Sequence, residues 1–157
     1  VATSGHRLID SDAVEALKED LLPLATIITP NLPEAEILVG YDLSDEVSII
    51  KAGYDIQKQY SVRNVLIKGG HLDGLAKDYL FLEKEGLITL SNQRINTIHT
   101  HGTGCTFAAV VAAELAKGQS ILNAVSTAKS FITSAIETAP ELGLGNGPVN
   151  HTSYQGD

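Results

Sequence analysis

The sequence contains no methionine and no tryptophan, and its only cysteine is Cys105. A single cysteine excludes an internal disulfide, which is consistent with a reducing, cytoplasmic environment. Long apolar runs are also lacking, since the longest, such as residues 108–113, are far too short to cross a membrane. No basic segment followed by an apolar one opens the chain, so we expect no secretory signal peptide.

Positive charge is scarce as well. The chain has 11 Lys and Arg against 19 Asp and Glu, for a formal net charge of −8, and the basic residues are scattered singly. This pattern argues against a nucleic-acid partner, because binding to a phosphate backbone needs clustered basic side chains. A polyphosphate can still bind, since backbone N–H groups and Mg²⁺ can make most of that contact. A hydrophobic content of 43% is enough for one core, so we expect residues 1–157 to form one domain.

Apolar periodicity predicts helices that alternate with strands. We expect helices over residues 11–22, 33–40, 103–117 and 121–137, and another carried by Ile49, Ala52, Ile56 and Tyr60. Short strands are expected at 26–29, 65–67, 79–82 and 87–90. The first helix should begin at a Ser11/Asp12 cap and place Val14, Leu17 and Leu21 on one face. The predicted fold is therefore α/β, with a mostly parallel sheet flanked by helices.

Residues 100–106, Thr-His-Gly-Thr-Gly-Cys-Thr, are the most informative segment. Two glycines open a helix that continues with apolar residues on nearly every side, so we expect that helix to be buried. Its first N–H groups have no partner within the helix, and glycines let a ligand approach the backbone closely. The segment can therefore bind an anion. The alternative is a tight turn into a core helix with a buried, structural Cys105.

Two further strand ends carry polar residues. Asn31 and Glu34 follow the strand at 26–29, and together they can orient Mg²⁺ through water. Alternatively, they are an ordinary helix cap and a carboxylate favoured by the helix dipole. Lys68 ends the strand at 65–67 beside two glycines, where it can reach a phosphate or simply be solvated. Three such sites at strand ends indicate one binding crevice.

In this order, the segments Thr-Pro-Asn-x-x-Glu (residues 29–34), Lys-Gly-Gly-His (68–71) and His-Gly-Thr-Gly-Cys-Thr (101–106) resemble the ribokinase-like superfamily. The resemblance is specifically to its hydroxymethylpyrimidine/phosphomethylpyrimidine kinase branch, and it covers all 157 residues. Residues 21–25, 29–36 and 145–151 are also similar to that branch, which usually has His where Asn146 stands. The resemblance implies a ribokinase-like fold and ATP-dependent, Mg²⁺-assisted phosphorylation of hydroxymethylpyrimidine and its monophosphate in thiamin biosynthesis.

The same resemblance implies roles for individual residues. Most of the superfamily has an aspartate base at the position of Cys105, and this branch has cysteine there, which makes Cys105 the candidate base. The candidate catalytic residues, base and anion hole together, are Cys105, Gly102, Thr103 and Gly104. The candidate nucleotide-binding residues are Asn31, Lys68, Gly70 and Lys129, and the candidate metal ligand is Glu34.

The family's full chain has an additional N-terminal region, with the first strands of the sheet and side chains that contact the pyrimidine. Val1 resembles a point well inside that sequence, so we expect this chain to be the C-terminal, nucleotide-binding part, with the N-terminal strands missing. An unpaired sheet edge favours association. We therefore expect a homo-oligomer or association with the missing N-terminal part. The alternatives are a pyridoxal kinase of the same fold and a non-catalytic nucleotide-binding fragment.

Two groups of polar residues are interpreted as structural. His99 and His101 alternate along the chain without a third ligand nearby, so a metal site there is not expected. Asp42, Asp45 and Glu46 are interpreted as a solvated helix start rather than a cation site.

Overall fold

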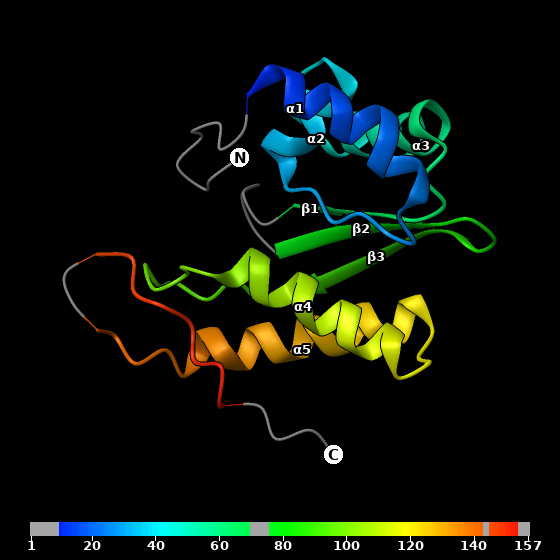
Figure 1. Ribbon diagram of the computed structural model, residues 1–157. Coiled ribbons are helices and arrows are strands. Elements are labelled where there is room, and N and C mark those ends of the chain that lie inside the picture. The colour runs from blue at the N-terminus through cyan, green and yellow to red at the C-terminus, as the bar shows by residue number, and fades with distance from the viewer. Residues whose placement is uncertain (1–9, 70–75, 143–144, 154–157) are drawn as a thin grey trace. The chain divides into compact units, whose positions relative to one another are not determined.

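The computed structural model describes residues 10–69, 76–142 and 145–153, and the chain forms two compact units, Val1–Arg94 and Ile95–Asp157 (Figure 1). The first unit contains α1 (Ser11–Ala16), η1 (Leu17–Leu21), η2 (Leu22–Leu24), α2 (Leu32–Val39), α3 (Glu46–Tyr60), β1 (Val65–Lys68), β2 (Ala76–Leu82) and β3 (Gly86–Asn92). The second contains α4 (Thr103–Ala116) and α5 (Ile121–Glu137). No helix in the described ranges is long and apolar enough to span a membrane. The single domain expected from length stays a prediction.

The sheet of the first unit has the order β1-β2-β3, and both of its strand pairs are antiparallel. A short turn joins β2 to β3 and requires antiparallel pairing, in agreement with the strands predicted there. The α/β class is confirmed. The sheet was expected to be mostly parallel, but among the described residues of this unit the only parallel pairing is the single bridges Ile28–Val65 and Asn31–Lys68. The strand expected at 26–29 is thus only half-buried chain that runs alongside β1.

The first helix differs from its prediction in register. Its N-cap is Asp10, whose side chain makes no capping hydrogen bond, rather than Ser11 or Asp12. From Leu17 to Leu21 the helix widens into a π-helix, which holds more residues in each turn. As a result, the leucine that is buried at the end of this segment is Leu22, which is 6% exposed. Leu21, which the sequence placed on the apolar face, is 58% exposed.

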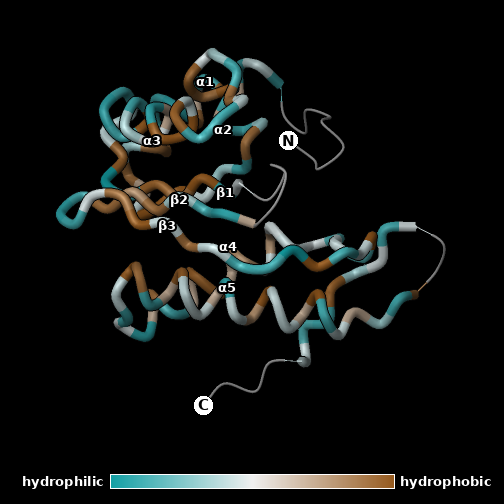
Figure 2. Tube along the Cα trace, turned by 180° about the vertical axis from the view of Figure 1, so that it is seen from behind, coloured by the Kyte–Doolittle hydropathy of each residue, from teal (hydrophilic) through white to brown (hydrophobic). Residues whose placement is uncertain are grey.

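The core of the first unit lies between the sheet and α2 and α3. Figure 2 shows the hydrophobic colouring along the middle of β1 and β2, where each strand carries a continuous apolar run. Ile49, Ala52 and Ile56 of α3 are fully buried against this sheet, as their spacing predicted. Gly53 lets the helix approach closely, because a Cβ there would lie 2.1 Å from the Phe81 ring.

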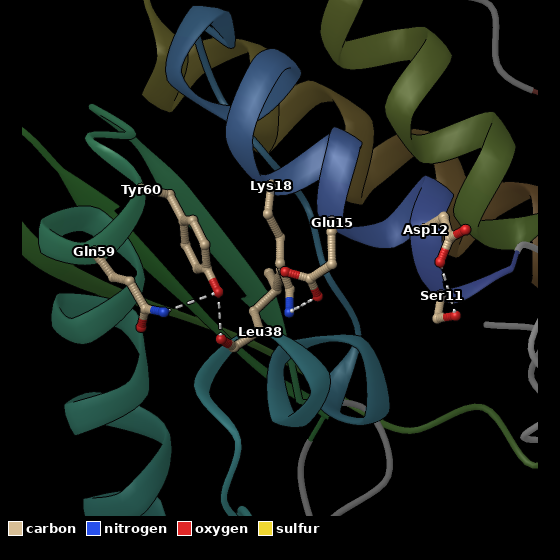
Figure 3. Close-up of polar contacts among 7 residues, drawn as sticks. All are labelled: Ser11, Asp12, Glu15, Lys18, Leu38, Gln59 and Tyr60. Atoms are coloured by element: carbon tan, nitrogen blue, oxygen red, sulfur yellow. Dashed lines mark hydrogen bonds and ion pairs between the residues drawn. The ribbon is translucent and has the colours of Figure 1, made fainter.

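Polar contacts join the helix ends of this unit (Figure 3). The Tyr60 hydroxyl, at the end of α3, donates to the Leu38 carbonyl at 2.7 Å, and so satisfies a carbonyl in the last turn of α2. Burial raises the pKa of Tyr60, which keeps this donor protonated. Lys18 and Glu15 pair on the neighbouring helix at 3.0 Å.

The start of α3 is built by a capping box. Asp45 accepts from the Ser48 N–H at 2.7 Å, and the Ser48 hydroxyl lies 3.2 Å from the Asp45 N–H. The hydrogen bonds from Ser48 hold the pKa of the Asp45 carboxyl below its usual value. This confirms the interpretation of Asp45 and Glu46 as a helix start, whereas Asp42 lies in irregular chain before it.

In the second unit, α4 and α5 pack side by side (Figure 1). Val125, Ala128 and Ile132 of α5 are buried, as the predicted stripe required. The expectation of a fully buried α4 is wrong, because only Phe107 and Val111 of that helix are buried. These two residues lie four apart on one face, whereas alanines on the other faces, such as Ala108, Ala109, Ala112 and Ala113, are exposed.

Candidate functional site

Asn31 and Glu34 form a capping box at the start of α2. The Asn31 Oδ1 accepts from the Glu34 N–H, and the Glu34 Oε2 accepts from the Asn31 N–H, both at 2.8 Å. This is the capping arrangement that was the alternative to a metal site. Carboxylate and amide oxygens are also the ligand types that Mg²⁺ prefers, so the same two side chains suit either role.

Lys68 lies beside Asn31, as the crevice hypothesis requires of these two residues. The Lys68 N–H donates to the Pro30 carbonyl at 2.9 Å, and Lys68 and Asn31 form a parallel bridge. The first unit therefore brings together three of the predicted site residues, Asn31, Glu34 and Lys68. Gly70, a predicted nucleotide contact, lies outside the described residues.

The end of β1 at Lys68 and Gly69 is held by the start of β2. The Gly69 N–H donates to the Lys77 carbonyl at 2.9 Å and to the Asp78 carboxylate at 3.2 Å. A Cβ on Gly69 would lie 2.3 Å from that carbonyl, so only glycine fits. In the strand register, Asp78 lies directly opposite Lys68.

Tyr79 and Lys77, also on β2, both contact Glu46 at the start of α3. The Tyr79 hydroxyl donates to Glu46 Oε1 at 3.2 Å, and Lys77 Nζ lies 3.4 Å from the same oxygen. Burial, reinforced by the negative charge of Glu46, raises the pKa of Tyr79 to about 12. These contacts connect β2, and with it the β1 end that carries Lys68, to α3.

In the second unit, α4 begins on a backbone that only glycine adopts readily. Gly102 is the N-cap, with φ of 87°, and has no side chain with which to cap the helix. Thr103 donates through its hydroxyl to the Thr100 carbonyl at 2.7 Å. Among the described residues, nothing accepts from the N–H groups of Gly104 and Cys105. The helix therefore presents unpaired donors at its positive end, as the anion-binding hypothesis predicted.

Cys105 is exposed in the first turn of α4. The interpretation of Cys105 as a buried structural residue is therefore wrong, and a solvent-accessible thiol lies beside the unpaired N–H groups. Lys129, the other candidate in this unit, is half-buried on α5, the helix that packs against α4.

The sequence did not predict how residues 147–151 would be used. They run alongside His101, which pairs with Pro148 in a parallel bridge, and His151 Nε2 lies 2.9 Å from the Thr106 hydroxyl of α4. The only sequence signal was the family resemblance of residues 145–151, which carries no information about their position. His99 is buried and accepts from the Gly147 N–H through Nδ1. In the part of the chain that the structure describes, no three His, Cys, Asp or Glu are grouped to hold a metal.

The predicted residues thus fall into two sets, each internally consistent. In the first unit, the oxygen ligands of Asn31 and Glu34 lie at the start of α2, beside Lys68 at the end of β1. This combination is suited to a cation and a phosphate. The second has backbone donors without an acceptor among the described residues, beside a cysteine whose thiolate can accept a proton. Both sets are what a phosphoryl transfer needs, since that reaction depends on positioning and charge neutralisation.

Comparison with known proteins agrees with this chemistry. A curated relative, the hydroxymethylpyrimidine/phosphomethylpyrimidine kinase of Staphylococcus aureus strain MSSA476, is 49% identical over 156 residues, which are 98% of this chain and 56% of the relative. The chain thus spans a little over half the length of the curated relatives that it matches.

Two solved structures have the same fold. An ADP complex of Bacillus subtilis pyridoxal kinase matches with a TM-score of 0.86 and 41% identity, covering 93% of this chain and 57% of that protein. The phosphomethylpyrimidine kinase of Clostridium difficile 630 matches with a TM-score of 0.71 and 36% identity, over 87% and 54% respectively. The fold is therefore that of the ribokinase-like kinases. The family model for phosphomethylpyrimidine kinase matches residues 1–150, so this chain belongs to the phosphomethylpyrimidine kinase family.

Proposed function

We propose that the protein carrying this chain phosphorylates hydroxymethylpyrimidine and then its monophosphate with ATP, as a step of thiamin biosynthesis. The observation that carries the proposal is the start of α4, where the unpaired N–H groups of Gly104 and Cys105 lie beside an exposed thiol. The identity of 49% to hydroxymethylpyrimidine/phosphomethylpyrimidine kinases supports the choice of substrate.

In this proposal the start of α4 acts as the anion hole. Gly102, Thr103, Gly104 and Cys105 form the hole, and the N–H groups of Gly104 and Cys105 are donors for the charge that develops on the transferred phosphoryl group. The Thr103 N–H already donates to the Thr100 carbonyl at 3.3 Å and so fixes the turn. The donors are already oriented, so no reorganisation is needed as the charge appears. Cys105, as its thiolate, accepts the proton of the substrate's hydroxymethyl group while the alcohol oxygen bonds to the γ-phosphorus of ATP and ADP leaves.

In the same proposal the nucleotide is bound by Asn31, Lys68, Gly70 and Lys129, and Glu34 is the metal ligand. Lys68 and Lys129 offset the negative charge of the phosphates. The donor set of Asn31 and Glu34 consists of oxygens, which Mg²⁺ prefers, and the 2.8 Å capping bonds hold both side chains at the start of α2. Mg²⁺, when bound there through water, would neutralise polyphosphate charge. The capping box itself fixes the orientation of both side chains.

A pyridoxal-type substrate is the second candidate. The observation in its favour is the TM-score of 0.86 to Bacillus subtilis pyridoxal kinase, higher than the 0.71 to the Clostridium difficile phosphomethylpyrimidine kinase. Both substrates carry a hydroxymethyl group on a flat nitrogen heterocycle, so the start of α4 can serve either.

The test is a comparison of kcat/KM for hydroxymethylpyrimidine and for pyridoxal with Mg-ATP, following ADP formation. The intact mass of the purified sample is measured beside it, to record whether a second polypeptide is present. We expect turnover of hydroxymethylpyrimidine to exceed that of pyridoxal at least tenfold. The reverse order would assign a pyridoxal kinase. Nucleotide binding without turnover of either compound would indicate a non-catalytic nucleotide-binding fragment.

A further inference from the structure

Residues 147–151 hold the backbone that leads into α4. The His101 N–H donates to the Gly147 carbonyl at 3.1 Å, and the Val149 N–H donates to the His101 carbonyl at 3.2 Å. The register cannot slip, because a Cβ on Gly147 would lie 2.5 Å from His99 Nδ1, the atom that accepts from the Gly147 N–H. This pairing ends one residue before Gly102, the N-cap of the helix.

The other end of this segment is anchored on α5. The Asn150 N–H donates to the Ala135 carbonyl at 2.9 Å, and the Asn150 amide donates to the Thr138 hydroxyl at 3.2 Å. His151 therefore comes directly after Asn150, which is hydrogen-bonded to α5, and α5 packs against α4. Its position is determined by α5 as well as by its own contact.

His151 contacts α4 through the hydroxyl of Thr106, with 2.9 Å between Nε2 and Oγ1. The Thr106 N–H closes the first turn on the Gly102 carbonyl at 2.9 Å. Residues three and four apart lie on the same face of a helix, so Thr106 shares its face with Gly102 and Thr103. His151 therefore contacts the same face of the first turn on which Gly102 and Thr103, two residues of the proposed anion hole, lie.

We propose that His151 is a positioning residue of the phosphoryl-transfer site, and that it acts through Thr106 on the first turn of α4. This inference rests on the proposed function. An anion hole accelerates phosphoryl transfer only if its donors keep their orientation. Gly102 and Gly104 have no side chains with which to hold that orientation. The support therefore comes from the hydroxyl of Thr106, which contacts His151. Because the hole acts on the transition state, loss of the support lowers kcat rather than nucleotide affinity.

The experiment uses the natural full-length protein that contains this chain, with Mg-ATP and hydroxymethylpyrimidine. The variants are His151→Ala, His151→Gln, Thr106→Val, the His151→Ala/Thr106→Val pair, and Thr152→Ala as control. Thr152 lies in the same segment and bonds to Asn150 rather than to α4. For each variant, kcat, the KM for ATP and Tm are measured.

We expect His151→Ala and Thr106→Val each to lower kcat about tenfold, the effect of one positioning hydrogen bond. The KM for ATP should stay within about twofold and Tm within about 2 °C, since the contact is exposed. The pair should be no slower than either single variant, because both remove the same contact. His151→Gln should recover most of kcat, because its amide can reach the Thr106 hydroxyl.

A normal kcat in His151→Ala would overturn the inference. So would a loss of kcat that follows a loss of Tm, or a His151→Gln variant as slow as His151→Ala. Absence of turnover in the unmodified protein contradicts the proposed function, and the inference with it. Absence of turnover is measured in the unmodified protein, whereas the other outcomes are measured in the variants, so the two kinds of failure can be told apart.

Discussion

At the scale of single residues, the candidate site residues differ in the hydrogen-bond donors and acceptors that they present. Gly104 and Cys105 have N–H groups for which nothing accepts in the described ranges, whereas Asn31 and Glu34 have oxygens already used once in capping. The first pair is therefore suited to direct contact with an anion. The second is suited to orienting a hydrated cation, because capping fixes the direction of its oxygens.

Replacing Cys105 with alanine should affect the two phosphorylation steps unequally. A general base contributes about 10²- to 10⁴-fold where a proton must leave an alcohol, but little where the acceptor is an ionised phosphate oxygen. We expect Cys105→Ala to slow phosphorylation of hydroxymethylpyrimidine about 100-fold or more, and that of its monophosphate less than about tenfold. Initial rates with each substrate supplied separately give the comparison. Equal losses in both rates would contradict the role of base.

Tyr79 should make stability depend on alkaline pH. Its pKa is raised to about 12 from an ordinary value of 10.0, so the neutral phenol is favoured in the folded state. The stability that this shift contributes is complete below pH 10 and is lost as pH rises towards 12. We therefore expect Tyr79→Phe to be less stable than the natural protein by about 1 kcal/mol near neutral pH, with a difference that shrinks above pH 10.

Urea unfolding at several pH values measures this difference. The control is Tyr54→Phe, at a tyrosine that is 47% exposed. A Tyr79→Phe difference that stays constant from pH 9 to pH 12 would show that the phenol is not protected by burial and Glu46.

At the scale of elements, the close contact between α3 and the sheet depends on Gly53. Alanine in the middle of a helix normally stabilises it by about 0.5–1 kcal/mol relative to glycine. Here the added Cβ would lie 2.1 Å from Phe81, which is fully buried and packed edge-on to the Tyr54 ring at 5.1 Å. We therefore expect Gly53→Ala to destabilise by about 1–3 kcal/mol, the opposite sign to helix propensity.

Chemical denaturation of Gly53→Ala, Phe81→Leu and the double variant tests this packing argument. The smaller leucine should leave room for the alanine, so the double variant should lose less stability than the sum of the two single variants. Additive losses would mean that α3 moves away from the sheet rather than clashing with the ring.

At the scale of the whole chain, the first unit contains a core in which strands and α3 are buried together. Leu66, Ile67, Leu80 and Phe81 are each 0% exposed, and their strands pair with each other. Amides in such a core exchange only in large unfolding events. We expect the amides of β1 and β2 to exchange at least about 100-fold more slowly than those of residues 93–98, measured by hydrogen exchange. Similar rates in both segments would contradict the assignment of the core.

Helix positions were predictable because their signals are local. Three such signals are the stripe of Ile49, Ala52 and Ile56, the two glycines at the start of α4, and the asparagine that precedes Leu-Pro at the start of α2. Each acts within one or two helical turns. The candidate anion site was predictable for the same reason, since orphan N–H groups are a property of any helix start that lacks a capping side chain. The family motifs added substrate and roles, which no periodicity contains.

The remaining features depend on residues far apart in the sequence. The π-helix moves burial from Leu21 to Leu22, because the turn adapts to the core that it meets. The exposure of α4 follows from its packing and not from its apolar composition. His151 meets Thr106 across 45 positions, and only the folded chain brings an imidazole to that hydroxyl. The sequence alone therefore determined where most helices lie and which helix start is the candidate anion site, because those signals are local. The tertiary structure decided which faces are buried and which side chains contact that helix start, because these depend on residues far apart in the chain.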